Sequence, residues 1–416
     1  MMRLLSILCG ALLLASSASA QRSAQRSAQR VLLIGLDGFR ADYLDRPAAV
    51  QLRALAARGV RAERMIPTFP SKTFPNHYSI VTGLFPEHHG IVANAMRDSV
   101  LGLFRLSDRA AVQTSAWWGG EPIWVTAERQ GRRAATYFWP GSEAAIGGVR
   151  PSWWYPYDGD RPNAERERQV LEWLALPADS APGFIALYFS DTDDAGHRHG
   201  PAAPQVDSAI ARGDSAVGRL VAGIARLGLS DQVNIIVVAD HGMAAVAPER
   251  TIVLDDDLDL TTVEIVDLNP VAMITPRDGD VSRVMRALQG AHPRLQVYRR
   301  ETRPARYRFR YHPRITPIVA IADDGWSIVA RGARSREVAV GSVRGGAHGY
   351  DPQLASMGAL FIAAGPGIAQ GRTISAFQNI HIYPLMAELM RLQPAPTDGA
   401  LDSVRTILRT RGASSP

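Results

Sequence analysis

The chain of 416 residues is long enough for one large domain or for a domain with an insert, and 46% hydrophobic residues support a substantial core. Its formal net charge of +6 comes from arginines interleaved with Asp and Glu, and Lys72 is the only lysine. This scatter leaves no basic stripe for a nucleic-acid duplex, although a mild positive potential favours small phosphates.

The first twenty residues are typical of a secretory signal peptide. Arg3 supplies the charge, residues 4–14 an apolar core, and residues 18–20 a small-residue cleavage site. The mature chain then has no cysteine, because Cys9 lies in the signal peptide. An exported chain without cysteines is more typical of a bacterial periplasmic or secreted protein than of a disulfide-rich extracellular protein. The apolar run is too short to span a bilayer, so we expect no integral membrane segment in the mature chain. Residues 21–30 repeat Gln-Arg-Ser-Ala and predict a disordered leader.

Four continuous apolar runs predict buried parallel strands, and most of them end in polar residues or glycine. They are residues 31–36, 183–189, 233–239 and 359–363. Helices are expected at residues 48–58, 208–227 and 380–390. Buried strands that alternate with helices predict an α/β layered sandwich with a central, largely parallel sheet.

Residues 262–344 have a different pattern, with short strands expected at 263–266, 272–274, 318–321 and 326–330 and a helix at 281–288. We interpret this region as a smaller, cap-like α+β insert between two parts of the main α/β domain, residues 31–261 and 345–393. Residues 394–416 form a polar tail.

The hydroxyl of Thr73 is predicted to lie at the start of a helix, where Pro75 suits the first turn. The free N–H groups of that turn and the helix dipole favour an anion bound near Thr73. A threonine hydroxyl is inert at neutral pH, so this site needs a base or a metal to activate it. We expect His77 to pack within the protein, and His88 and His89 to be exposed.

Carboxylates and imidazoles in four other segments could supply that metal. They are Asp37, Asp193, Asp240, His197, His241 and His348. Such nitrogen and oxygen donors without a thiolate suit catalytic Zn²⁺. Together with Thr73 they are too many for one tetrahedral ion and fit two ions, which can hold the attacking and leaving oxygens of a displacement at phosphorus. On spacing alone, three nearby residues compete with Asp193 and His197, namely Asp191, Asp194 and His199.

The segments that carry these residues resemble, in the same order, the nucleotide pyrophosphatase/phosphodiesterases of the alkaline phosphatase superfamily. The matching segments are 72–92, 188–201, 240–243 and 348–351, with further similarity at 117–124 and 138–143. The resemblance covers most of the chain after the leader, and it implies an alkaline-phosphatase-like fold.

The resemblance also implies two Zn²⁺ ions per chain and a covalent mechanism. One ion would be held by Asp37, Thr73, Asp240 and His241. The other would be held by Asp193, His197 and His348. Thr73 would be the nucleophile, forming a phosphothreonine ester with the nucleoside monophosphate.

Several neighbouring residues gain substrate-binding roles from the same resemblance. Asn94 and the backbone N–H of Thr73 would bind the non-bridging phosphoryl oxygen, where charge develops. Phe74 and Tyr188 would sandwich the nucleobase. Lys72 either receives the distal phosphates of the substrate or shapes the loop beside Thr73.

The function implied is a two-zinc phosphodiesterase/pyrophosphatase that releases nucleoside 5′-monophosphates from ATP, dinucleoside polyphosphates or nucleotide esters. Alternatives within the superfamily are a lysophospholipid or choline-phosphate diesterase and a phosphomonoesterase, whereas a sulfatase needs Cys or Ser in place of Thr73. A zinc-stabilised binding protein without catalysis is a further alternative. The aromatic cluster of residues 153–157 lines the pocket or packs as a hydrophobic loop, and the sequence leaves both interpretations open.

Overall fold

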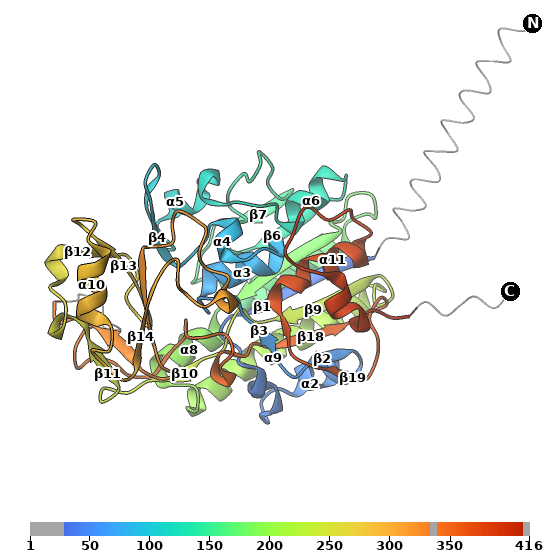
Figure 1. The fold of residues 1–416 in the computed structure, drawn as a ribbon. Coiled ribbons are helices and arrows are strands. Elements are labelled where there is room, and N and C mark those ends of the chain that lie inside the picture. Colours follow the sequence, from blue (N-terminus) through green and yellow to red (C-terminus); the bar gives the residue numbers. More distant parts are fainter. Residues whose placement is uncertain (1–28, 333–338, 411–416) are drawn as a thin grey trace, which may run out of the picture.

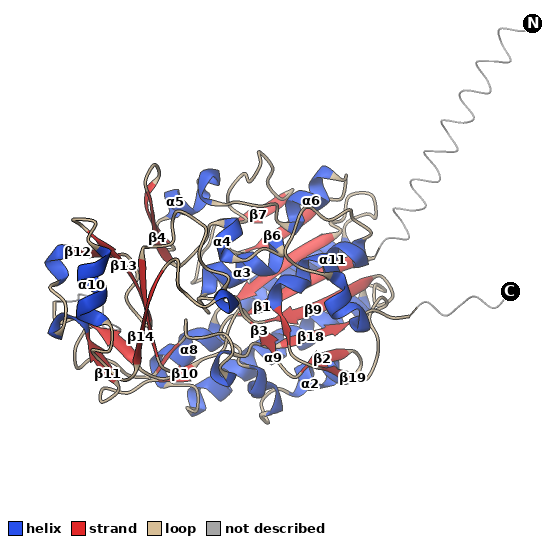
Figure 2. Ribbon diagram, viewed as in Figure 1, coloured by secondary structure: helices blue, strands red, loops and turns tan. Residues whose placement is uncertain are grey.

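The structure, a computed structural model, describes residues 29–332 and 339–410. The expected signal peptide, residues 21–28 of the leader and the end of the tail lie outside these residues. Within the described ranges, no helix combines the length and the apolar character needed to cross a membrane. A large sheet with surrounding helices forms one part of the molecule, and a smaller sheet lies at one end (Figures 1 and 2).

The large sheet has eight strands, and the four strands predicted from apolar runs lie side by side at its centre. In spatial order the strands are β19 (Arg372–Ile374), β2 (Val60–Ala62), β18 (Phe361–Ala364), β9 (Val233–Val238), β1 (Arg30–Leu36), β8 (Phe184–Phe189), β6 (Ala134–Tyr137) and β7 (Trp153–Tyr155). All neighbours pair in parallel except β18, which runs antiparallel to β9 and β2. The predicted α/β fold with a largely parallel sheet is therefore confirmed.

The register of the three central strands brings their carboxyl ends together. Leu36 of β1 lies opposite Phe189 of β8, and Gly35 lies opposite Val238 of β9. Almost every residue of these strands is buried, as expected for strands covered on both faces. The polar residues that follow each strand consequently meet at one edge of the sheet, where ligand sites of open α/β sheets form.

The three predicted helices are present with slightly different ends, as α2 (Val50–Ala57), α9 (Pro204–Arg226) and α11 (Ile382–Met390). Helix α9 contacts α2, α7 (Asn163–Ala175) and α8 (Asp191–His199). Helix α11 contacts β1, α3 (Thr73–Thr82) and α6 (Ile123–Arg129). The remaining α-helices outside the smaller sheet are the short α4 (Pro86–His89) and α5 (Arg109–Gln113), within the described part of the chain.

Within α4 the structure corrects one prediction, because His89 is fully buried whereas His88 is exposed. His89 lies within hydrogen-bonding distance of the Ser79 hydroxyl, and its ring packs against Tyr78. The run of charged and polar residues around it gave no sign of this contact between α3 and α4.

The smaller sheet is antiparallel, with strand order β12 (Val263–Ile265), β13 (Val271–Pro276), β15 (Ile318–Ala322) and β14 (Leu295–Arg299). Helix α10 (Val281–Leu288) contacts β13 and β14, and its buried Val284 and Leu288 belong to a separate apolar cluster with Ile274 and Ile318. The strands predicted at 263–266, 272–274 and 318–321 and the helix at 281–288 are thus confirmed, whereas β14 was not predicted.

Short two-stranded pairs complete the fold. They are β3 (Met65–Ile66) with β20 (Phe377–Gln378), β4 (Ala95–Asp98) with β5 (Gly102–Arg105), β10 (Ala244–Ala245) with β17 (Gly346–Ala347), and β11 (Thr251–Val253) with β16 (Ser327–Val329). The strand predicted at 326–330 is β16, and it pairs with β11 instead of joining the four-stranded sheet. An alternating pattern indicates a strand but does not identify its partner.

Candidate active site

A cleft of about 1160 Å³ opens at the carboxyl edge of the large sheet. Its lining includes Asp37 after β1, Asp193 and His197 on α8 after β8, His348 after β17, and Thr73 at the start of α3. Asp240 and His241 follow β9 and are fully buried, and Nε2 of His241 lies 3.5 Å from Oδ1 of Asp37 in the cleft lining. The fold therefore brings together all of the side chains predicted as metal ligands.

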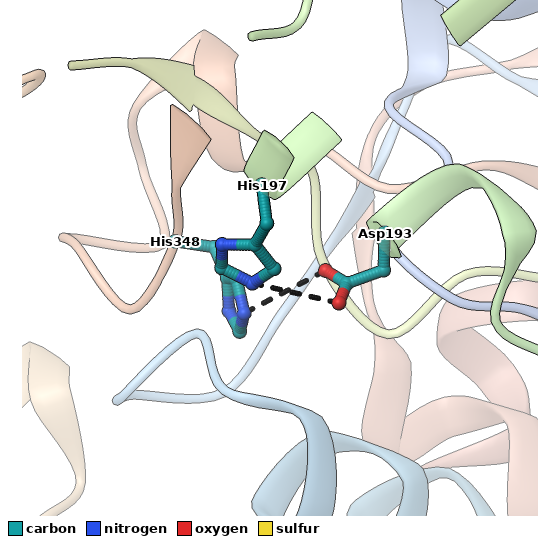
Figure 3. A group of neighbouring side chains, drawn as sticks. All are labelled: Asp193, His197 and His348. Atoms are coloured by element: carbon teal, nitrogen blue, oxygen red, sulfur yellow. Dashed lines mark ion pairs between the residues drawn. The ribbon is translucent and has the colours of Figure 1, made fainter. Parts of the chain in front are cut away.

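The first group of candidate ligands consists of Asp193, His197 and His348 (Figure 3). Nε2 of His197 lies 3.5 Å from Oδ2 of Asp193, and Nε2 of His348 lies 3.7 Å from Oδ1 of the same carboxylate. Asp193 and His197 share one face of α8 because they are four residues apart. Asp191, Asp194 and His199, which competed with them on spacing, belong to none of the candidate metal groups among the described residues.

The second group lies beside the first and contains Asp37, Asp240 and His241. Nε2 of His241 lies 2.9 Å from Oδ2 of Asp240 and 3.5 Å from Oδ1 of Asp37. The Thr73 hydroxyl oxygen lies 3.4 Å from the same Nε2. The His241 and His348 rings stack at 3.5 Å, so the two groups form one continuous site with Thr73 at its edge.

Each of the three histidines directs Nε2 at the site because a backbone carbonyl engages its Nδ1. The carbonyls of Gly346, Gly242 and Ser71 lie 2.9 Å from Nδ1 of His197, His241 and His348, respectively. A Nδ1–H that donates to a carbonyl fixes the ring orientation and the tautomer, which leaves the Nε2 lone pair for a metal.

Hydrogen bonds from neighbouring groups also orient two of the carboxylates. The Tyr188 hydroxyl donates to Oδ2 of Asp37 at 2.5 Å, and the Gly38 N–H donates to Oδ1 of Asp240 at 3.2 Å. Among the described residues, no hydrogen-bond partner reaches the buried atoms Oδ1 of Asp37 or Oδ1 of Asp193, whereas Oδ2 of Asp240 faces ring nitrogens of His241 at 2.9 Å and His77 at 3.3 Å. Buried carboxylate oxygens without donors are costly unless a cation occupies the space between them, so these residues fit divalent metal ions.

The pKa values of these carboxyl groups also indicate that the site needs positive charge to keep all of them ionised. Burial raises the pKa of Asp37 well above its usual value, and the nearby Asp240 and Asp193 raise it further. Burial also opposes ionisation of Asp240, yet the charges of His241 and His77 hold its pKa well below the usual range. Three carboxylates this close cannot all ionise without a counter-charge, which bound metal ions would supply.

Gly38 allows α8 to approach the end of β1. Its φ of +64° is a left-handed conformation that favours glycine, and a Cβ there would lie 2.9 Å from Cα of Asp193. The turn after Asp37 therefore has space for the Asp193 backbone only because residue 38 has no side chain.

Thr73 is the first residue of α3, as predicted, and Asn94 lies beside it. The backbone N–H of Phe74 donates to Oδ1 of Asn94 at 2.9 Å, which leaves the amide NH₂ of Asn94 for another partner. The start of α3 and the Asn94 amide together present N–H donors next to the Thr73 hydroxyl.

The two residues predicted to sandwich a nucleobase differ in their surroundings. Phe74 is half-buried, lines the cleft and packs against Phe104 and Trp118 with ring centroids 6.0 Å away. Tyr188 also lines the cleft, but it is only 8% exposed, with its ring 5.2 Å from that of His77.

Tyr157 offers a larger aromatic surface to the cleft, since it is 41% exposed and its ring lies 6.2 Å from that of Tyr188. Buried Glu143 holds this residue, accepting from the Tyr157 N–H at 3.1 Å and pairing with Arg109. Trp153, Trp154 and Tyr155 instead form edge strand β7. Of the aromatic cluster at residues 153–157, only Tyr157 lines the cleft. The interpretation as a pocket lining therefore applies to Tyr157, and the interpretation as a packed hydrophobic segment applies to the other three residues.

Lys72 lines the cleft and is almost fully buried. Its ammonium is 2.5 Å from Oδ2 of Asp267 and donates to the Asn269 carbonyl at 3.0 Å. These contacts connect the loop before Thr73 to the loop between β12 and β13, and they use two of the three ammonium donors.

The profile of the type I phosphodiesterase/nucleotide pyrophosphatase family matches residues 31–351. Human ectonucleotide pyrophosphatase/phosphodiesterase family member 5 is 35% identical over 408 residues, covering 98% of this chain and 83% of its own. The bis(5′-adenosyl)-triphosphatase of Xenopus laevis is 36% identical, with 91% of this chain and 81% of its own covered. A venom phosphodiesterase of Crotalus durissus collilineatus is 36% identical over 95% of this chain.

The chain spans about half the length of that venom enzyme, 48%. Among solved structures, murine ectonucleotide pyrophosphatase/phosphodiesterase 5 superimposes with a TM-score of 0.86 at 35% identity, covering 92% of this chain and 100% of its own. That structure is of an inactive threonine-to-alanine variant in complex with AMP. The fold, the family profile and the relatives agree: this chain belongs to the type I phosphodiesterase/nucleotide pyrophosphatase family of the alkaline phosphatase superfamily.

Proposed function

We propose that this protein hydrolyses phosphodiester or phosphoanhydride bonds of nucleotides and releases nucleoside 5′-monophosphates. The observation that carries the proposal is the Thr73 hydroxyl, which lies in the cleft 3.4 Å from Nε2 of His241 and beside candidate metal ligands. ATP, dinucleoside polyphosphates and nucleotide esters are the expected substrates.

Two Zn²⁺ ions fit the nitrogen and oxygen donors of the site, which contains no thiolate. We assign Asp37, Asp240, His241 and Thr73 to one ion. Asp193, His197 and His348 are assigned to the other. When bound, two such ions would lower the pKa of the Thr73 hydroxyl and offset the negative charge of the phosphoryl group.

Thr73 acts as the nucleophile in this proposal. Its hydroxyl proton leaves to solvent, its oxygen forms a bond to phosphorus, and the bond from phosphorus to the leaving oxygen breaks. A water molecule then displaces Thr73 from phosphorus, which frees the nucleoside monophosphate and restores the hydroxyl. The Asn94 NH₂ and the Thr73 N–H donate to the phosphoryl oxygen on which charge develops.

Phe74 and an aromatic residue across the cleft would hold the nucleobase, and stacking tolerates different bases. We favour Tyr157 over Tyr188 for this role, because Tyr157 exposes more of its ring and the Tyr188 hydroxyl is engaged by Asp37. The AMP complex of the murine relative supports a nucleotide ligand, and the inactivity of its threonine-to-alanine variant supports a threonine nucleophile.

We further propose that the enzyme works outside the cytoplasm, in a bacterial periplasm or as a secreted protein. The predicted signal peptide and the relatives named as ecto-enzymes support this assignment. Localisation of a tagged full-length chain by cell fractionation tests it, and retention with the cytoplasmic fraction would contradict it.

Incubation of the zinc-loaded protein with ATP, followed by identification of the products, tests the proposed reaction. We expect AMP and pyrophosphate from the wild type and from Thr261→Ala, which alters an exposed threonine outside the cleft. Thr73→Ala should lose the activity. Release of ADP and phosphate would identify a phosphomonoesterase, and turnover of choline-phosphate diesters in preference to nucleotides would also contradict the proposal.

A further inference from the structure

Asn76 is a fully buried asparagine on α3, three residues after Thr73. Its Nδ2 donates to the carbonyls of Pro70 and Lys72, each at a distance of 2.9 Å. These two hydrogen bonds use both hydrogens of the amide group. One side chain therefore holds two carbonyls of the loop that leads to the proposed nucleophile.

The carbonyl of Lys72 and the N–H of Thr73 belong to the same peptide group. A trans peptide group is planar, so its C=O and N–H point in opposite directions and fixing one fixes the other. The backbone N–H of Asn76 donates to the same Lys72 carbonyl at 3.1 Å, so two donors of one residue hold it. Thr73 is the first residue of α3, and its N–H has no acceptor within the helix.

The oxygen of the Asn76 amide group is held as firmly as the nitrogen. Oδ1 accepts from the N–H of Thr68 at 2.7 Å and from the Thr68 hydroxyl at 3.0 Å. It also accepts from Nδ2 of Asn379 at 2.9 Å. A rotation of the amide group by 180° would place donors against donors and oxygen against carbonyls, so only one orientation of Asn76 fits.

A chain of buried hydrogen bonds supports Thr68 from behind. Nδ1 of His89 accepts from the N–H of Ile91 at 3.1 Å, so Nε2 carries the proton and donates to the Ser79 hydroxyl at 3.0 Å. The Thr68 hydroxyl donates its only proton to Asn76, so the Ser79 hydroxyl donates to Thr68 at 3.2 Å. The chain begins at His89 and ends at Asn76, and each of its side chains is buried.

We propose that Asn76 is a positioning residue for the reaction, because it fixes the peptide group whose N–H binds the phosphoryl oxygen. This inference rests on the proposed function, in which the Thr73 N–H donates to the oxygen on which charge develops. Such a donor is effective when it is directed at that oxygen before the reaction begins. Asn76 is fully buried, so it acts through the backbone and not by contact with the substrate.

Asn76→Asp tests this role, because a carboxyl group keeps an oxygen for Thr68 and Asn379 but lacks the NH₂ donors. We expect kcat for p-nitrophenyl thymidine 5′-phosphate at saturating zinc to fall by about 10- to 100-fold, since loss of a donor to a developing oxyanion costs on the order of 10²–10³. KM should change little, because the donor acts mainly on charge that develops in the transition state.

Asn234→Asp is the matched control. Asn234 is equally buried, lies at the start of β9 and donates from Nδ2 to Gln29 at 2.8 Å. This variant should keep the wild-type kcat. A wild-type kcat in Asn76→Asp would overturn the inference alone, whereas absence of turnover in the wild type would overturn the proposed function as well.

The preference between phosphorothioate isomers separates positioning from a general structural loss. Sulfur is a weaker acceptor than oxygen, so donors directed at one non-bridging oxygen distinguish the Rp and Sp isomers of p-nitrophenyl thymidine 5′-phosphorothioate. The ratio of the two rates does not depend on the amount of folded enzyme. We expect this ratio to move towards one in Asn76→Asp and to stay unchanged in Asn234→Asp. An unchanged ratio in Asn76→Asp would overturn the proposal.

A crystal structure of the wild-type protein with AMP gives a test that needs no variant. We expect the Thr73 N–H within hydrogen-bonding distance of a phosphoryl oxygen while Nδ2 of Asn76 still donates to the Lys72 carbonyl. A peptide group between Lys72 and Thr73 that is turned away from either partner would overturn the proposal.

Discussion

The hydroxyl of Tyr188 donates a hydrogen bond to Oδ2 of Asp37 at 2.5 Å, and Oδ1 of the same carboxylate belongs to the candidate metal site and has no hydrogen-bond partner among the described residues. Tyr188 thus orients a candidate ligand of the metal. A residue in this position affects metal affinity through the orientation of the carboxylate.

Tyr188→Phe removes this hydrogen bond and keeps the aromatic ring. We expect metal affinity to fall by about 10- to 100-fold, because partners of ligating carboxylates contribute at that level. Competition with a chelator measures the affinity, and the KM for a nucleotide should be unchanged at saturating zinc. Metal affinity equal to that of the wild type would contradict the role of Tyr188 in orienting Asp37.

Tyr157→Ala is expected to impair nucleotide hydrolysis selectively. Loss of one stacking partner costs about 1–3 kcal/mol per base, which corresponds to a kcat/KM for ATP that is lower by about 5- to 160-fold. Hydrolysis of bis(p-nitrophenyl) phosphate, which has no nucleobase, should be little affected. Tyr311→Ala, which truncates a tyrosine that is 76% exposed, is the control and should leave both rates unchanged. Equal losses on both substrates would argue against base stacking.

Gly38→Ala is expected to disturb the metal site, because the new Cβ would lie 2.9 Å from Cα of Asp193. Displacement of a ligand by about 1 Å can reduce activity on the order of 100-fold. Gly102→Ala is a matched control, since Gly102 has a φ of +84° but a Cβ there would meet no atom of the described residues within 4 Å. If both variants lose the same activity, backbone strain and not the approach of α8 is responsible.

Mild acid should destabilise the fold through His89. Burial lowers its pKa to about 3, so the folded state holds it neutral, whereas the unfolded chain binds a proton near its usual pKa of 6.5. The stabilisation that comes from keeping His89 neutral in the folded state is fully present above pH 6.5. As the pH falls from 6.5 towards 3, the free energy of unfolding decreases by up to about 1.4 kcal/mol per pH unit.

Urea unfolding between about pH 7.5 and about pH 5 measures this effect. We expect the stability of His89→Asn to depend less on pH than that of the wild type. The control His292→Asn should retain the wild-type slope. A wild-type slope in His89→Asn would show that other groups account for the acid sensitivity.

The convergence of Asp37, Asp193 and Asp240 could be predicted from the sequence because each follows a buried apolar strand. Parallel neighbours bring such ends to one edge, and the spacing of Asp193 and His197 on a helix is a local property. The partner of β16 and the antiparallel direction of β18 could not be predicted in this way, since they depend on how distant segments pair.

The surroundings of Tyr157 and His89 could not be predicted from the sequence either. Tyr157 reaches the cleft because the segment after edge strand β7 is held by Glu143, a contact between residues fourteen positions apart. The burial of His89 depends on the packing of α4 against α3. Neither contact leaves a periodic pattern, so the surroundings of both residues become apparent only in the folded chain.

In the proposed reaction, Thr73 attacks phosphorus and carries the nucleoside monophosphate as a covalent ester. The most direct measurement is mass spectrometry of peptides from the zinc-loaded protein, quenched in acid during turnover of ATP. We predict an added AMP moiety on the peptide that contains Thr73, and no adduct in Thr73→Ala. An AMP adduct on another residue, or wild-type turnover by Thr73→Ala, would contradict Thr73 as the nucleophile.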